Sequence, residues 1–249
     1  MQTTIDSCEM LLKPLACRYA FYFEAAGHNP VQAANCQRFR SASIIKVPIL
    51  LAWAWLERAG EVDQGEICDL DAEPPVRGSG FAWRMQARRL PYHDVLLMMI
   101  ATSDNLCTNL VIRRIGMKRL QAIIHDALDL PGAELQRRLM DYEARAKGLD
   151  NFVSPAALIR CFELVDGLPA EQKTWVDAML VCNQDAALLA RDHPRDTLDF
   201  YHKTGSMDGV LNDWGYTRDR RIFLLTEGFS AELPVFEVFG RLGRLLLEG

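Results

Sequence analysis

The sequence predicts an α+β fold, in which a five-stranded antiparallel sheet flanked by helices carries an inserted all-helical segment. Strand-like runs lie in the first forty and the last fifty residues, whereas residues 43 to about 190 are mostly helical in pattern. Connections of hairpin length between the strand-like runs favour antiparallel pairing. We therefore expect a single domain over 1–249, with the sheet and its flanking helices in 1–40 plus 191–249 and the helical part in 41–190.

Local patterns define the individual elements. Runs of β-branched and aromatic residues bounded by turn signals predict strands over 18–24, 35–40, 199–203, 210–217 and 221–226. Apolar residues at helical spacing predict helices over 5–12, 44–59, 93–101, 106–115, 156–165 and 170–181. The tail is predicted to form a closing amphipathic helix from the spacing of Val235, Val238, Phe239, Leu242, Leu245 and Leu246.

Composition and charge exclude several classes of protein. The chain has 249 residues, 49% hydrophobic and 24% charged, and its net charge of −5 lacks the basic excess that binding to nucleic acid needs. Its longest apolar run, Val47 to Leu56, has ten residues and is too short to cross a membrane. We expect a small-molecule substrate, no nucleic-acid or membrane partner, and a monomer or weak homo-oligomer.

The N-terminal residues carry Asp6, Glu9 and Lys13 among their apolar residues and do not resemble a secretory signal. The chain as written is expected in the cytoplasm, or in the periplasm or outside the cell if the true start lies upstream. Seven scattered cysteines without a Cys-x-x-Cys pair indicate reduced thiols, and the five histidines show no ligand spacing. We expect neither a metal nor another cofactor.

Three short motifs follow one another along the chain: Ser43-Ile44-Ile45-Lys46, Ser103-Asp104-Asn105 and Lys203-Thr204-Gly205. Together they supply a nucleophile, proton carriers and a strand that can bind an anion, which is the equipment of an enzyme that acylates its own serine. Each motif alone also occurs by chance. The ordered set is therefore the evidence for catalysis.

The first motif pairs a hydroxyl with an amine. If a helix begins at Ser43, Lys46 lies about 4.5 Å further along its axis and about 60° round, so both groups share one face. Unsatisfied amides of the first turn would stabilise an oxyanion on the carbonyl that Ser43 attacks. Burial and a second cation, for which Lys203 is the candidate, would lower the pKa of Lys46. In the alternative interpretation, Ser41 or Ser43 is an N-cap and Lys46 a snorkelling side chain.

The second motif falls between two predicted helices and should form a short turn. Such turns present polar side chains into clefts. Ser103 would pass a proton to the leaving nitrogen, Asn105 would hold a substrate amide, and Asp104 would brace the turn. The alternative is an ordinary helix cap.

The third motif ends a strand-like run. Gly205 removes a side chain where the backbone must approach a ligand, and the Ser206 amide would be a second oxyanion donor. Lys203 and Thr204 would bind a substrate carboxylate. The alternative is a common strand end that contains glycine.

These motifs and their spacing resemble the active-site set of the class A β-lactamases and their relatives, the penicillin-recognising serine hydrolases. The resemblance implies a helical domain packed on a five-stranded antiparallel sheet, with the cleft between them. It also implies that Ser43 is acylated, Lys46 is its base and Ser103 the proton shuttle. Asn105 would contact a substrate amide; the carboxylate and oxyanion contacts would come from Lys203, Thr204, Gly205 and Ser206.

Hydrolysis also needs a base that activates water. The family carries a glutamate followed by proline on a loop between the second and third motifs; the corresponding stretch here offers Glu143 without the proline, and Asp141 two residues earlier. The resemblance implies that Asn151 takes the place of the loop asparagine that helps to hold the water in that family. Alternatively, Leu135, Leu139, Tyr142 and Ala146 define a surface helix on which Glu143 is merely solvated. The strand after Lys203 also lacks the arginine that many relatives use as a second carboxylate contact.

The leading hypothesis is a metal-independent β-lactamase that opens the β-lactam amide through an acyl-Ser43 intermediate. A second hypothesis is a D-alanyl peptidase or a small ester or amide hydrolase with the same residues. The third is from another class, a β-lactam-binding receptor that deacylates too slowly to turn over. Glu143 discriminates among the three.

Overall fold

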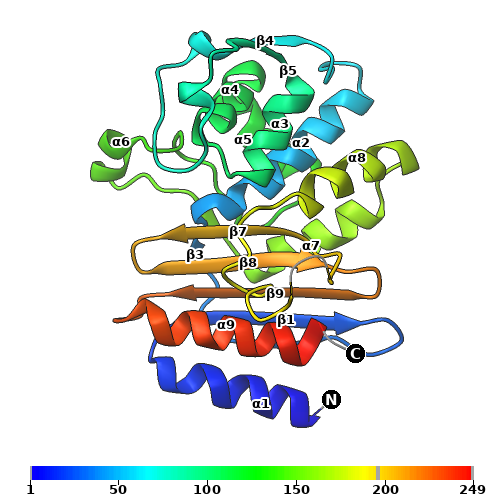
Figure 1. Ribbon diagram of the computed structural model, residues 1–249, viewed down its shortest axis with the longest axis vertical. Coiled ribbons are helices and arrows are strands. Elements are labelled where there is room, and N and C mark those ends of the chain that lie inside the picture. Colours follow the sequence, from blue (N-terminus) through cyan, green and yellow to red (C-terminus); the bar gives the residue numbers. More distant parts are fainter. Residues whose placement is uncertain (1, 195–196, 248–249) are drawn as a thin grey trace.

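The computed structural model describes residues 2–194 and 197–247, so residues 1, 195–196 and 248–249 of the predicted sheet segment lie outside the described part. Its centre is an antiparallel five-stranded sheet with strand order β2-β1-β9-β8-β7 (Figure 1). The predicted α+β class is confirmed. The sheet strands are β1 (Arg18–Ala25), β2 (Val31–Ala34), β7 (Tyr201–Met207), β8 (Val210–Tyr216) and β9 (Arg220–Glu227). Two small pairs join β3 (Phe39–Arg40) to β6 (Phe152–Val153) and β4 (Ile67–Asp69) to β5 (Arg89–Pro91).

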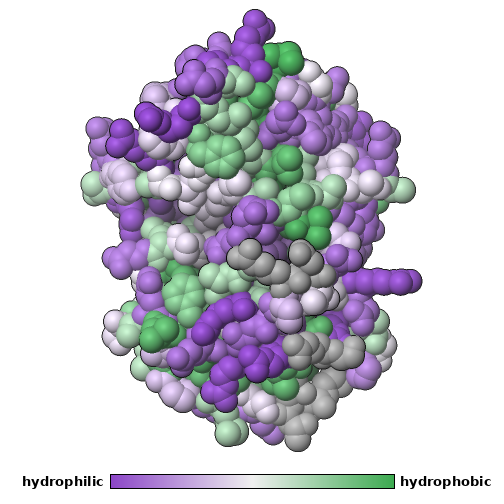
Figure 2. Space-filling view, viewed as in Figure 1, coloured by the Kyte–Doolittle hydropathy of each residue, from purple (hydrophilic) through white to green (hydrophobic). Residues whose placement is uncertain are grey.

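Helices cover both faces of the sheet. The α-helices are α1 (Gln2–Leu12), α2 (Lys46–Arg58), α3 (Tyr92–Ala101), α4 (Asn105–Ile115), α5 (Met117–Ala122), α6 (Tyr142–Ala146), α7 (Pro155–Asp166), α8 (Ala170–Val181) and α9 (Glu232–Leu247). Short helical turns are η1 (Lys13–Leu15), η2 (Ala42–Ile45), η3 (Leu70–Ala72), η4 (Ala82–Arg84) and η5 (Ile123–Ala127). None of the described helices is both long and apolar enough to span a membrane. On the face seen in Figure 2, hydrophilic side chains are interspersed with small apolar areas.

Side-chain alternation along β1 divides the core into two layers. Phe21 belongs to a cluster with the terminal helices α1 and α9, whereas Tyr22 belongs to the larger cluster that includes the inserted helices. Because β1 pairs with β9, as in the register Phe21 with Leu224, the two ends of the chain form the middle of the sheet. The helical part from α2 to α8 then packs on the other face and beyond the β7 edge (Figure 1).

The predicted strand over 35–40 is confirmed only at Phe39–Arg40, which form β3, and is wrong before them. The Asn35 backbone amide still donates to the Tyr19 carbonyl (3.1 Å), but the Asn35 side chain accepts from the Tyr19 amide (2.7 Å) and donates to the Cys17 carbonyl (3.0 Å). Side-chain bonds thus replace the backbone ladder here, and β2 ends at Ala34. The chain then leaves the sheet. β3 pairs with β6 instead, which ties the segment before Ser43 to a distant loop.

The predicted helix over 44–59 divides into two kinds of helix. Residues 42–45 form the 3₁₀ turn η2, and the α-helix α2 begins at Lys46. Pro48 is tolerated in the first turn, where its missing amide proton would have no helical partner. Helix α2 is buried on nearly every side and runs through the centre of the helical part.

Candidate active site

The 3₁₀ turn η2 brings the first two predicted residues together. Side chains three positions apart lie almost above one another in such a turn. Accordingly, Lys46 Nζ is 3.1 Å from Ser43 Oγ. The contact arises from 3₁₀ geometry, not from the α-helix that the spacing predicts. Ala42, directly before the serine, has φ 46°, a strained value for a residue with a side chain.

Lys46 is fully buried among oxygen atoms. Besides Ser43 Oγ, its Nζ lies 2.9 Å from Ser103 Oγ, 2.6 Å from the Ser103 carbonyl and 3.1 Å from Asn105 Oδ1. Loss of hydration and then the charge of Lys203 hold the pKa of Lys46 well below its usual value. In its neutral form the amine has two protons and one lone pair, so the lone pair can accept a proton from one of the two serine hydroxyls. This is the arrangement of a base beside its nucleophile.

Ser103 occupies the turn between α3 and α4, with φ 54°. Asp104 fixes that turn, because its buried carboxylate accepts hydrogen bonds from the amides of Ala82 (2.8 Å) and Cys107 (3.0 Å). It is the N-cap of α4. A side chain at Gly80 would overlap Asp104, so glycine is required there. The strain at Ser103 is therefore held by its neighbours, and its hydroxyl stays on Lys46.

Asn105 links the amine to the opposite rim. Its Oδ1 accepts from Lys46, its Nδ2 donates to the Arg77 carbonyl (3.2 Å), and its backbone amide donates to the Ser79 carbonyl (3.2 Å). Both Asn105 and Ser79 line the pocket described below. The asparagine is thus held between the Lys46 amine and the opposite rim of the pocket.

Lys203 and Thr204 lie on β7, but their polar groups already have partners. Lys203 is fully buried and donates to the Thr204 carbonyl (2.8 Å), and burial lowers its pKa to about 8. The Thr204 hydroxyl donates to Asp185 Oδ2 (2.9 Å). The Asp185 carboxylate thus already accepts the hydrogen bond that the sequence prediction gives to a substrate carboxylate.

Gly205 allows β7 to touch the nucleophile turn. A Cβ there would lie 2.9 Å from the Ile44 amide nitrogen and the Ser41 carbonyl oxygen, and 3.0 Å from the Ser43 amide nitrogen. The glycine therefore permits contact between two backbones, which the sequence prediction did not include. As a result, Ser206 and Ser43 lie side by side on the pocket wall, where their amides could share an oxyanion.

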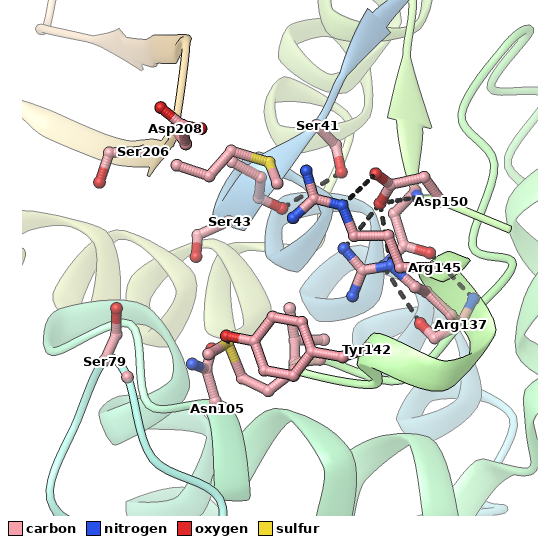
Figure 3. Close-up of a pocket in the computed structure, with 16 residues that line it drawn as sticks. Ser41, Ser43, Ser79, Asn105, Arg137, Tyr142, Arg145, Asp150, Ser206 and Asp208 are labelled. Carbon is pink, nitrogen blue, oxygen red and sulfur yellow. Dashed lines mark hydrogen bonds and ion pairs between the residues drawn. The ribbon is translucent and has the colours of Figure 1, made fainter. Parts of the chain in front are cut away.

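A pocket of about 350 Å³ opens in front of Ser43 (Figure 3). Of the predicted residues, Ser43, Asn105, Asn151 and Ser206 line it, whereas Lys46, Ser103, Lys203, Thr204 and Gly205 are not among its lining residues. The lining residues are Ser41, Ala42, Ser43, Gly78, Ser79, Asn105, Arg137, Leu139, Met140, Tyr142, Arg145, Asp150, Asn151, Ser206, Met207 and Asp208. Within the described residues, no group of histidine, cysteine, aspartate and glutamate side chains is arranged to hold a metal.

The loop over 135–151 forms one wall of the pocket, and Leu139 is one of the residues that line it. Asn109 of α4 accepts from the Leu139 amide (2.9 Å) and donates to its carbonyl (3.1 Å), which fixes this position. Glu143 is exposed in the first turn of α6, and Asp141 caps that helix by accepting from the Ala144 amide (2.9 Å). Neither carboxylate is among the lining residues.

Asn151 and Asp150 close the neck of this loop. The Asn151 side chain accepts from the amides of Gln136 (2.9 Å) and Arg137 (3.1 Å), and its carbonyl accepts from the Ser41 amide (2.9 Å). Asp150 pairs with Arg137 at 2.6 Å. Asn151 therefore fastens the loop to the segment before the nucleophile. The alternative surface helix over 135–146 shortens to α6, because Leu135 and Leu139 are buried.

Sequence reasoning missed most of this wall. Tyr142, Arg145, Met140, Arg137 and Asp150 all line the pocket, yet none belongs to a motif. Met140 has φ 61°, a conformation that local pattern does not predict for methionine. Charged residues on a loop near a candidate water-activating residue were the one available signal.

Solved structures of similar fold include a β-lactamase from Sphaerobacter thermophilus, with a TM-score of 0.85, 23% identity, and coverage of 98% of this chain and 95% of that one. PBP-A matches with a TM-score of 0.84 and 19% identity over 100% of this chain and 96% of its own. A variant of PBP-A, solved as an acyl-enzyme complex with penicillin G, matches with a TM-score of 0.82, 19% identity, and the same coverage. No curated protein matched.

A family model described as the β-lactamase enzyme family matches residues 9–248. That range contains the serine, the lysine beside it, the turn of Ser103 and strand β7. The chain belongs to the β-lactamase enzyme family.

Proposed function

We propose that this protein is a serine hydrolase that opens β-lactam amide bonds through an acyl-Ser43 intermediate and releases the acyl group slowly. The observation that carries the proposal is the buried amine of Lys46 within 3.1 Å of both Ser43 Oγ and Ser103 Oγ. A base that contacts nucleophile and proton shuttle at once suits acylation. The similarity in fold to PBP-A, a variant of which was solved as an acyl-enzyme with penicillin G, supports this chemistry.

Acylation proceeds in two steps. Lys46 takes the proton of the Ser43 hydroxyl as Oγ attacks the lactam carbonyl, and a C–O bond forms while the oxyanion faces the amides of Ser43 and Ser206. The C–N bond then breaks, and the proton passes from Lys46 through the Ser103 hydroxyl to the leaving nitrogen. The product is an ester at Ser43, and no redox change occurs.

Slow release follows from the wall opposite the serine. Hydrolysis of the ester needs a base that takes a proton from water on the exposed side of the acyl carbon. On this wall Leu139 and Met140 have no base to offer, and Asp150 is paired with Arg137. Asp141 caps α6, and Glu143 is exposed to solvent. Acyl-Ser43 should therefore form faster than it is hydrolysed.

A second candidate function is favoured by the same wall. An ester that water does not remove quickly remains available to another acceptor, so a D-alanyl peptide-like amide is also a suitable substrate. In that case acyl transfer to an amine, or slow peptidase activity, is the physiological reaction.

The test combines intact mass with turnover. Incubation with benzylpenicillin should add the mass of one intact penicillin, and a chromogenic cephalosporin should show one rapid equivalent followed by slow turnover. Ser43→Ala should give neither adduct nor turnover, and an adduct that survives this change would refute the nucleophile. Fast, sustained hydrolysis would contradict slow release, and the absence of any adduct or turnover would contradict β-lactam opening.

A further inference from the structure

One wall of the pocket carries two arginines, which no step of the acylation uses. Asn105 and Ser206, the contacts for the acyl amide and the oxyanion, line this pocket, whereas Ser103, which serves the leaving nitrogen, does not. The pocket therefore takes the acyl part of the substrate. Figure 3 shows Arg137 and Arg145 on the side of the pocket formed by the 135–151 loop, pointing toward its interior.

Arg137 is committed to holding the loop. Its Nε and Nη2 donate to Asp150 Oδ1 at 2.9 Å and 2.6 Å, and its Nη1 donates to the Arg138 carbonyl at 3.0 Å. Its side chain is only 9% exposed. This guanidinium has a carboxylate partner and little access to a ligand.

Arg145, on α6, is placed differently. Its Nε lies 3.6 Å from Asp150 Oδ2, which is longer than a hydrogen bond, and its side chain is 36% exposed. The described residues give its guanidinium no hydrogen bond. Since Asp150 already pairs with Arg137, the two arginines and one aspartate leave this wall with an excess positive charge. Asp208, the other acidic lining residue, stands on the opposite side, on the turn after β7 (Figure 3).

The alternative place for an anion is already filled. The Thr204 hydroxyl is bonded to Asp185, and Lys203 is fully buried and turned to a backbone carbonyl. A guanidinium offers two parallel N–H groups that match a carboxylate, and this pairing is strongest where water is partly excluded. Arg145 is the group in the pocket that meets both conditions.

We propose that Arg145 binds a carboxylate on the acyl side chain of the substrate, so that the enzyme prefers acidic acyl donors. The inference rests on the proposed acylation of Ser43 and adds the substrate class. The carboxylate would lie between Arg145 and the Tyr142 side chain, which lines the same wall and is 62% exposed. Neutral acyl groups would enter the same pocket without this contact.

Two penicillins provide a matched pair of probes. Carbenicillin is benzylpenicillin with one carboxylate added to the side-chain carbon, and the two share the lactam and its leaving side. The quantity to measure is the ratio of their second-order rate constants for acylation of Ser43, followed by intact mass. Compared with an enzyme that lacks the contact, a partly exposed charge-assisted contact should raise the ratio of the carbenicillin to the benzylpenicillin rate constant about tenfold.

Variants on the same helix separate local contact from general charge. Arg145→Gln should lower the carbenicillin to benzylpenicillin ratio about tenfold. Lys147→Gln removes the same charge from the exposed end of α6, outside the pocket lining, and should leave the ratio as in the wild type. Arg145→Lys keeps the charge without the planar fork and should give an intermediate ratio, which also covers the case that Arg145→Gln fails to fold.

The outcomes are distinguishable. A ratio unchanged by Arg145→Gln or by Arg145→Lys, or lowered equally by Lys147→Gln, would overturn the assignment of Arg145 while leaving acylation intact. No adduct with either penicillin would instead contradict the proposed function. A ratio that falls at Arg145 alone would support an acidic acyl donor.

Discussion

At the scale of single residues, the reactivity of the site depends on whether Lys46 is protonated. Lys46 is neutral at a lower pH than an ordinary lysine, because burial and Lys203 disfavour its charge. Lys203, with a pKa of about 8, is still charged at neutral pH. Its charge therefore lowers the pKa of Lys46 without a hydrogen bond between the two amines.

The first prediction concerns the pH dependence of acylation. The rate constant for benzylpenicillin should rise as pH rises through the pKa of Lys46, since only the neutral amine takes the proton of Ser43. Lys203→Met removes a cation that lowers this pKa, so the rising limb should move to higher pH. Stopped-flow or quenched mass spectrometry over a pH series measures both profiles. A profile that coincides with the wild type, or moves to lower pH, would contradict the coupling.

Sequence predicted the residues that are close in the chain or lie in a motif. The spacing of Ser43 and Lys46 predicts contact, and their atoms are 3.1 Å apart. Leu139 and Arg145 could not be predicted in the same way, because a hydrogen-bonding partner thirty positions away, Asn109, and the neck of the loop determine where they point. Local pattern carries no record of such distant partners.

At the scale of elements, the site depends on how closely β7 approaches η2. Gly205 makes this approach possible, since a methyl group there would meet three backbone atoms at 2.9 to 3.0 Å. The sequence prediction assigned this glycine to ligand contact and did not include its contact with the turn. The position of a second element was required to see its role.

Gly205→Ala should therefore move strand β7 away from the turn η2. We expect a loss of stability of about 1–3 kcal/mol, because the backbone atoms cannot move aside as a flexible side chain can, and acylation should slow by more than the loss of folded protein explains. Gly65→Ala is the control, as its Cβ would meet only the Asp63 side chain, at 3.3 Å. Thermal unfolding and penicillin adduct formation are the measurements. Wild-type acylation in Gly205→Ala would argue against a shared oxyanion site.

The loop wall yields a further prediction. Leu139→Glu places a carboxylate where Asn109 holds the backbone toward the pocket, so acyl-Ser43 should be hydrolysed about 10²-fold faster. Leu139→Gln has a similar shape without the base and should show little gain. Glu143→Gln should leave the lifetime of the adduct unchanged, because Glu143 is exposed. A longer lifetime in Glu143→Gln would restore Glu143 as the water-activating residue.

At the scale of the whole molecule, one apolar cluster joins the inserted helices to the sheet. Phe162 of α7 stacks on Trp214 of β8 with ring centroids 4.6 Å apart, and on Tyr22 of β1 at 6.0 Å. Trp214 also donates from its indole to the Leu158 carbonyl at 2.9 Å. We propose that the sheet and the helices unfold as one unit.

Phe162→Ala tests this proposal. The side chain is 2% exposed, so its removal should cost about 3–5 kcal/mol while circular dichroism and tryptophan fluorescence still report one transition. Phe81→Ala, at a position 53% exposed, should change stability by no more than about 0.5 kcal/mol. Two separate transitions in the wild type would show that the helical part and the sheet are independent domains.

The pairing of β1 with β9 also has a consequence for the order of folding. These strands lie about two hundred residues apart in the chain, yet they are neighbours in the centre of the sheet. During synthesis, β1 leaves the ribosome long before its partner exists, and its edge stays unpaired until the last hairpin is made. The helical part can begin to collapse before β9 is made. The sheet would therefore form late in folding, and β7 would approach Ser43 only then.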